Sequence, residues 1–353
     1  MRHGGGRLAD FVRKPWARVA FSRAPMLTSR RRLVGSVASA LLLGGASGAT
    51  RAQRGRIRRI GYLSLRAGPG PLEEDFFAAL RELGYVEGRN LEVVYRWAAD
   101  KEERLPAIAA QLVQADVEVI VTSATPAISA AMGATSKIPI VMQSAADPIG
   151  SGFVTSLAHP GGNVTGMTLL STELAAKRLQ MMRELVPHSK STSLLAFDNA
   201  FATPLLISAM KTASQQLQLD LVVQLVKTDE DLPRAFAGFE KARAGTVVVQ
   251  TSPFAAARRE KIAELAARHR IPAMYEVPAY VDAGGLIAYG PDGPALTRRS
   301  AVFVDKILKG AKAGDLPIEQ PTKYQLAINL QAAQALGLVI PQSLLLRADS
   351  IRR

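Results

Sequence analysis

From about residue 58 onward, short apolar runs alternate with segments whose apolar residues recur every three to four positions. The short runs predict β-strands and the longer segments predict amphipathic helices. The expected strands are residues 58–65, 91–97, 117–122 and 138–142, and the expected helices are 72–84, 102–115 and 126–134. This strand–helix alternation predicts a parallel, doubly wound sheet with right-handed crossovers.

A turn cluster at residues 159–163, His-Pro-Gly-Gly-Asn, interrupts the alternation, which then restarts. The second half predicts helices at 172–185, 204–217, 232–242, 255–269 and 294–309, strands at 193–197, 221–226, 246–250, 271–275 and 286–290, and a final strand and helix within 324–336. We therefore expect an α/β protein with two doubly wound parallel-sheet lobes joined by a multi-stranded hinge. Lobe 1 comprises residues 57–165 plus about 291–322, lobe 2 comprises 166–290 plus about 323–353, and the loop 160–166 forms the first connection between them.

The segment before these lobes has the pattern of an export signal. Arg30, Arg31 and Arg32 follow Ser29, a short apolar run rich in small residues follows, and Ala49 and Ala52 are candidate cleavage positions. The paired arginines favour a twin-arginine signal, with an ordinary secretory signal as the alternative. Residues 1–52 are thus expected to be an N-terminal extension and signal, starting at Met1 or at Met26, and the mature chain to be periplasmic. An exported protein is not expected to depend on ATP or NAD(P)H.

Charge and cysteine content narrow the function further. Of 44 basic and 30 acidic residues, ten and one respectively precede Gln53, which leaves 34 and 29 and a net charge of +5 instead of +14. Such a mildly basic surface does not predict nucleic-acid binding. The chain has no cysteine, so disulfides, thiolate nucleophiles and cysteine metal sites are excluded. No second apolar run approaches membrane-spanning length, and we expect no membrane insertion of the mature chain.

Polar side chains gather where the expected strands end, which is where open parallel sheets bind their ligands. The candidate ligand-binding residues are Ser64, Ser123, Thr125, Asp147, Asp198, Asn199 and Tyr289. Ser123, Thr125 and the helix that starts there can hold a carboxylate, and Asp198 can accept from an ammonium group. Each position also has a structural interpretation: Thr125 as an N-cap before Pro126, the aspartates as turn formers, and Tyr289 as hinge packing.

Catalytic and cofactor motifs are missing from the sequence. His159, His188 and His269 do not have metal-ligand spacing, and there is no His-Glu-x-x-His, Gly-x-Ser-x-Gly or phosphate-binding loop. We therefore expect no catalytic residue, no metal and no cofactor.

Several stretches together resemble the bacterial ABC transporter substrate-binding proteins that include tryptophan- and phenylalanine-binding members. They are residues 60–63, 77–90, 147–154, 160–166, 265–273, 284–290 and 316–323, within a resemblance that runs from about Arg58 to Asp349. The resemblance implies a type I periplasmic binding fold, a ligand held between the lobes, and delivery to a permease in the inner membrane. Members with an assigned ligand bind amino acids. The family usually carries an Asn-Pro pair at this strand end of the second lobe, and Phe197-Asp198-Asn199-Ala200 of this chain departs from it.

The sequence therefore predicts the periplasmic solute-binding component of an ABC importer. We expect it to be non-enzymatic and to have a small solute and an inner-membrane ABC permease as its partners. The expected solute is an amino acid or related carboxylate, bound by hinge closure to a monomer. A ligand-binding module for a membrane sensor and a periplasmic hydrolase are the alternatives.

Overall fold

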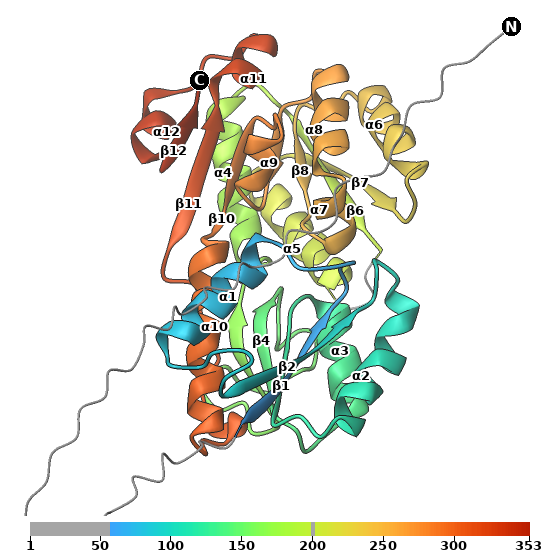
Figure 1. The fold of residues 1–353 in the computed structure, drawn as a ribbon. Coiled ribbons are helices and arrows are strands. Elements are labelled where there is room, and N and C mark those ends of the chain that lie inside the picture. The colour runs from blue at the N-terminus through green and yellow to red at the C-terminus, as the bar shows by residue number, and fades with distance from the viewer. Residues whose placement is uncertain (1–56, 199–201) are drawn as a thin grey trace, which may run out of the picture. The chain divides into compact units, whose positions relative to one another are not determined.

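The computed structural model describes residues 57–198 and 202–353, which contain two β-sheets (Figure 1). The first sheet has the order β2-β1-β3-β4-β5, and all its strands are parallel. Its strands are β1 (Arg58–Ser64), β2 (Leu91–Trp97), β3 (Val119–Thr122), β4 (Ile140–Ala145) and β5 (Val164–Thr168). The order reverses between β1 and β3, so the carboxyl ends of these strands form a topological switch point.

Helices cover both faces of the first sheet. They are α1 (Pro71–Glu82) and α10 (Gly293–Leu308) on one face, and α2 (Leu105–Gln114), preceded by the 3₁₀ turn η1 (Glu102–Arg104), and α3 (Thr125–Ala134) on the other. With helices on both faces, the central strands β1 and β3 are buried except for the first two residues of β1, as is usual for parallel sheets. The start of α10 is fixed by Asp292, whose Oδ1 accepts from the Ala295 N–H at 3.0 Å.

The second sheet has seven strands in the order β12-β11-β10-β9-β8-β6-β7, with a switch point between β6 and β8. Its strands are β6 (Ser191–Phe197), β7 (Asp220–Val226), β8 (Val247–Val249), β9 (Ala273–Tyr275), β10 (Ile287–Pro291), β11 (Tyr324–Asn329) and β12 (Ser350–Arg352). The parallel pattern predicted for this lobe is confirmed from β6 to β10. It does not extend to β11, which runs antiparallel to β10 and has β12 parallel to itself.

Two helical layers also cover the second sheet. One contains α4 (Leu174–Leu185), α5 (Ala202–Gln216), α11 (Leu330–Ala335) and α12 (Gln342–Arg347), and the other contains α6 (Asp231–Lys241), α7 (Pro253–Ala257), α8 (Arg259–Arg268) and α9 (Ala279–Asp282). The short elements α9, α12 and β12 carry no clear periodicity and were not predicted. Each layer has its own apolar core, so each sheet is the centre of a three-layer lobe.

Three segments of the described chain connect the lobes: the residues between β5 and α4, between β10 and α10, and between the 3₁₀ turn η2 (Ala313–Asp315) and β11. The last two lie side by side, because Pro291 and Tyr324 pair at the end of the β10–β11 ladder. These crossings form the predicted multi-stranded hinge.

The prediction that residues 160–166 form the first connection between lobes is wrong. Val164–Thr168 is β5, which pairs with β4 inside the first sheet, so the chain leaves this lobe only after Thr168. Gly166 allows the pairing: its φ is +129°, and a Cβ there would lie 2.1 Å from the Met142 carbonyl oxygen. The division into lobes at residue 165 therefore falls inside a strand, and the remaining domain limits stay predictions.

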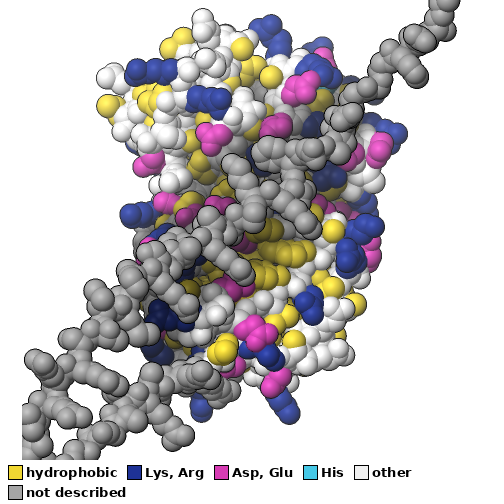
Figure 2. All heavy atoms as spheres, viewed as in Figure 1, with side chains coloured by type: hydrophobic (Ala, Val, Ile, Leu, Met, Phe, Trp, Pro, Cys, Tyr) yellow, Lys and Arg dark blue, Asp and Glu magenta, His cyan; other side chains and the backbone are white. Residues whose placement is uncertain are grey.

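The expected extension and signal, residues 1–52, lie outside the described residues. Within the described ranges, none of the helices combines the length and the apolar character needed to cross a membrane. On the face shown in Figure 2, basic and acidic side chains are interspersed over the surface, as the small net charge of residues 53–353 suggests.

Candidate functional site

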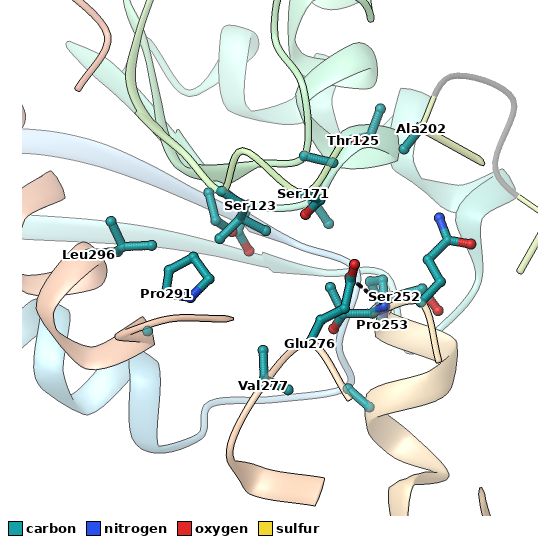
Figure 3. Close-up of a pocket in the computed structure, with 18 of the residues that line it drawn as sticks. Ser123, Thr125, Ser171, Ala202, Ser252, Pro253, Glu276, Val277, Pro291 and Leu296 are labelled. Carbon is teal, nitrogen blue, oxygen red and sulfur yellow. Dashed lines mark hydrogen bonds between the residues drawn. The ribbon is translucent and has the colours of Figure 1, made fainter. Parts of the chain in front are cut away.

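A cleft of about 240 Å³ lies where the carboxyl ends of both sheets converge (Figure 3). We call it the central cleft. Its lining residues follow β3, β4 and β5 of the first sheet and β8, β9 and β10 of the second, and they include the starts of α5, α7 and α10. This is the position that the two switch points predict for a ligand.

The start of α3 forms one polar part of the wall. Ser123 is half-buried, Thr125 is 3% exposed, and both line the central cleft. The prediction that Thr125 is the N-cap is wrong by one residue: Ala124 is the N-cap and Thr125 is the first helical residue. Within the described chain no side chain caps α3, and Ala124 is held at a φ of +67°. The first-turn N–H groups thus remain available to an anion, at a backbone position that is strained for a residue other than glycine.

The end of β4 adds an amide and a carboxylate. Gln143 is 4% exposed, and its Oε1 accepts from the Tyr62 hydroxyl at 2.8 Å, whereas its Nε2 has no hydrogen-bond partner in the described chain. Asp147 is partly exposed, and its Oδ1 accepts from the Gly150 N–H at 2.8 Å. The turn-forming role considered for Asp147 is therefore present, and its carboxylate also lines the same side of the central cleft.

A buried ion pair forms the floor on the side of the second sheet. Arg178, on α4, places Nη1 2.7 Å from Oε1 of Glu276, and the two side chains are 1% and 2% exposed. Oε2 of Glu276 accepts from the Thr251 N–H at 2.8 Å, the contact drawn in Figure 3, where the carboxylate points into the cavity on the side of Ser171. Burial raises the pKa of Glu276, opposed by the Arg178 guanidinium, and burial lowers the pKa of Arg178, opposed by Glu276. Each charge is thus tolerated because the other is present.

The same arginine is bonded to the hinge. Its Nε donates to the Tyr289 carbonyl oxygen at 2.9 Å, and Nη1 also donates to the Ser171 carbonyl oxygen at 3.2 Å. Ser171 lies on the first crossing, and Tyr289 is two residues before the end of β10, where the second crossing begins. Gly290 is required here, because a Cβ would lie 1.8 Å from the Glu276 carbonyl oxygen. Arg178 therefore joins the cleft floor to the first of the three crossings and to β10, the strand that leads into the second.

Other polar residues at the second sheet are already occupied. The Ser252 hydroxyl caps α7 by accepting from the Ala255 N–H at 3.0 Å. Gln250 accepts from the Phe197 N–H at 2.9 Å and donates to the Thr203 hydroxyl at 3.0 Å. These two side chains shape the wall and hold the strand ends together.

The remaining lining is mainly aliphatic. Its apolar members include Leu72, Leu169, Leu206, Val277, Pro291 and Leu296. The charged members among the described lining residues are Asp147, Arg178 and Glu276. An aliphatic wall with a few fixed polar groups is the usual composition of a small-molecule site.

The structure brings together three of the predicted site residues, Ser123, Thr125 and Asp147, in the central cleft. Ser64 lines a neighbouring recess of about 380 Å³, which Ser123 and Ala124 also border. Tyr289 is absent from the described cleft lining, and its ring stacks on Tyr324 beside the hinge, with 6.0 Å between ring centroids.

Asp198 lies in a different recess of about 290 Å³. Its Oδ2 is 3.0 Å from Lys227 Nζ, and both side chains are more than half exposed. Glu102 of the first lobe borders the same recess, and burial together with the nearby Asp198 and Glu103 carboxylates raises the pKa of Glu102. Asn199 lies outside the described residues.

The candidate ligand-binding residues chosen from the sequence did not include Gln143, Arg178 or Glu276. A signal for Arg178 was present: within the predicted helix 172–185 it occupies the same face as Leu174, Met181 and Leu185, all of which are buried. A charged residue at a core position of an amphipathic helix needs a buried partner. The sequence does not identify that partner, because Glu276 is 98 residues away.

Fold and cleft together define a two-lobed α/β binding protein with its site between the lobes. Comparison with known proteins gives the family: the profile described as "ABC transporter substrate binding protein" matches residues 72–352. The chain belongs to the family of ABC transporter substrate-binding proteins. Proteins of this family bind solutes outside the cytoplasm and act with a membrane permease, as the sequence predicted.

Individual relatives agree with this assignment. The chain is 24% identical over 267 residues to a tyrosine-binding protein of Clostridioides difficile, covering 75% of this chain and 76% of the relative. A conserved domain protein from Vibrio cholerae is 27% identical with a TM-score of 0.79, over 84% of this chain and 100% of that one. A domain from Streptococcus pneumoniae in complex with L-Trp has a TM-score of 0.76 at 23% identity, over 83% and 99% of the two chains, which confirms the type I periplasmic binding fold.

Proposed function

We propose that this protein is the non-enzymatic, periplasmic solute-binding component of an ABC importer, and that its solute is an amino acid or a closely related carboxylate. The observation that carries the proposal is the central cleft, in which groups from the carboxyl ends of both sheets face a common space. The amino acids named for the relatives support the solute class.

The polar groups suit the two ends of an amino acid. The uncapped start of α3, with Ser123, Thr125 and Gln143, offers donors to a carboxylate. Asp147 offers an acceptor for an ammonium group at the end of the neighbouring strand. The aliphatic lining then packs against the side chain of the solute.

The mechanism is hinge closure: the solute binds between two lobes that are joined by three chain crossings. A solute that contacts both walls binds the closed form more tightly than the open form, and so shifts the hinge equilibrium toward closure. The permease then recognises the closed form. Micromolar affinity corresponds to roughly −8 kcal/mol, which a few charge-assisted hydrogen bonds and an apolar wall can supply.

The test is a thermal-shift screen of the full-length chain with the common amino acids and with acetate and benzoate, followed by calorimetry. We expect at least one amino acid to raise the melting temperature and to bind at about micromolar affinity. Small-angle scattering with and without that amino acid should show a more compact form when it is present. A chain that no amino acid or carboxylate stabilises would refute the proposed solute class.

A further inference from the structure

Arg178 has donors that the protein does not use. A guanidinium carries five N–H groups. The hydrogen bonds of Arg178 come from Nε, to Tyr289, and from Nη1, to Ser171 and Glu276. Across the described residues no protein atom accepts from Nη2, although the side chain is only 1% exposed and lines the central cleft. The hydrogen bonds of the described protein leave the two N–H groups of Nη2 unused, and Arg178 lines the central cleft, so a bound solute can accept from them.

The direction of Nη2 is fixed before any solute arrives. The guanidinium is planar, and its other two nitrogens are held by carbonyl oxygens of the hinge and by a carboxylate. A donor held in this way binds an acceptor without losing much conformational entropy. Because Glu276 neutralises the charge, the acceptor can be one oxygen of a carboxylate or an amide carbonyl, and no second full charge is needed.

Gln143 supplies an independent observation on the opposite wall. Its Nε2 is buried without a partner among the described atoms, and the Tyr62 hydroxyl holds its Oε1. Leaving a buried donor unpaired is unfavourable, so both walls of the cleft present donors that need an acceptor.

We propose that Arg178 is a specificity-determining residue that binds an acceptor oxygen of the solute through Nη2, with Glu276 as its positioning residue. The proposal rests on the proposed solute-binding function and extends it to a residue of α4 that is bonded to the hinge. The guanidinium group that would bind the solute through Nη2 also donates hydrogen bonds to the carbonyl oxygens of Ser171 and Tyr289. Recognition of that oxygen is thereby linked directly to the crossings that move on closure.

The experiment compares the full-length wild type, Arg178→Lys and Arg183→Lys by calorimetry with L-tyrosine, L-tryptophan and L-leucine. Lysine retains a charge beside Glu276 but cannot bond the hinge and also present Nη2. Arg183 is an exposed arginine on the same helix, bonded to the Leu217 carbonyl oxygen, and serves as the matched control. We expect Arg178→Lys to weaken binding about 10- to 100-fold, the effect of one charge-assisted hydrogen bond, and Arg183→Lys to change it less than about twofold.

A crystal structure of the wild type with the bound amino acid is the second measurement, and it decides the matter if Arg178→Lys does not fold. A solute oxygen within hydrogen-bonding distance of Nη2 supports the proposal. Equal affinities for the two variants, or a solute that leaves Nη2 without contact, would overturn it. If none of the three amino acids binds the wild type, the wider thermal-shift screen decides on the solute class, and a wild-type crystal grown in sodium formate decides on Arg178 alone. Formate bound to Nη2 supports its role, and Nη2 bonded only to protein or water refutes it.

Discussion

Replacing Glu276 by glutamine should destabilise the protein far more than its single-atom change suggests. The substitution removes the negative charge that compensates Arg178, whose side chain is 1% exposed. Removing one partner of a buried ion pair costs about 3–5 kcal/mol of stability, because the charge of the other partner stays buried without compensation. The free energy of unfolding of a typical protein is about 5–15 kcal/mol, so this is a large fraction of the total.

Urea unfolding at pH 7, followed by circular dichroism, measures the effect. We expect the midpoint of Glu276→Gln to fall by about 1 M or more. The matched control is Glu319→Gln, because Glu319 makes an exposed pair with Arg299 at 2.6 Å and should contribute about 0–1 kcal/mol. If both variants lose the same small amount of stability, the reasoning about the buried pair is wrong.

Removing both charges gives a second check. The variant Arg178→Met with Glu276→Met should be more stable than Glu276→Gln alone, because no uncompensated charge remains. It should stay below the wild type, because the carbonyl oxygens of Tyr289 and Ser171 and the N–H of Thr251 lose their partners, at about 1 kcal/mol each. A double variant as unstable as the single one would show that lost packing, and not charge, dominates.

Three further predictions concern the cleft, the surface and export. Asp147→Asn should weaken amino-acid binding at least about 10-fold in calorimetry by removing the charge opposite the ammonium group, whereas Asp220→Asn, on an exposed strand end, should not. A hydrogen bond from Arg258 lowers the pKa of Asp229, so the stability that the Asp229 carboxylate contributes is present above the usual carboxyl pKa and is lost as pH falls through the lowered pKa. The free energies of unfolding of Asp229→Asn and the wild type should therefore converge as the pH is lowered. A difference in stability that does not change with pH would contradict this. Replacing Arg30 and Arg31 together by lysine should retain precursor in the cytoplasm in a fractionation assay, and unchanged export would favour an ordinary secretory signal.

Much of the fold follows from the sequence because the spacing of apolar residues distinguishes strands from helices along most of the chain. The exceptions are local. Val164–Thr168 contains Gly166 and follows a Pro-Gly-Gly turn, so its strand character was hidden, and it became visible only through pairing with β4. The reversed direction of β11 depends on the path of the chain back from the first lobe, which no local pattern encodes.

The site was predictable as far as it depends on strand ends. Ser123, Thr125 and Asp147 come together because the carboxyl ends of parallel strands meet at one edge of a sheet. Asp198 also follows a strand, but it lines a different recess, where it pairs with Lys227. The pair of Arg178 and Glu276 depends on contacts between distant segments and could be recognised only in three dimensions.

The path of the chain has a consequence for biosynthesis. Helix α10 covers the first sheet, yet it is translated after almost all of the second sheet, and β11 and β12 join that second sheet only at the end of the chain. Neither half can therefore complete its core while the polypeptide is still emerging from the ribosome. Folding is finished only after translation ends, so the proposed export would carry an unfolded or a folded chain depending on the interval between release and translocation.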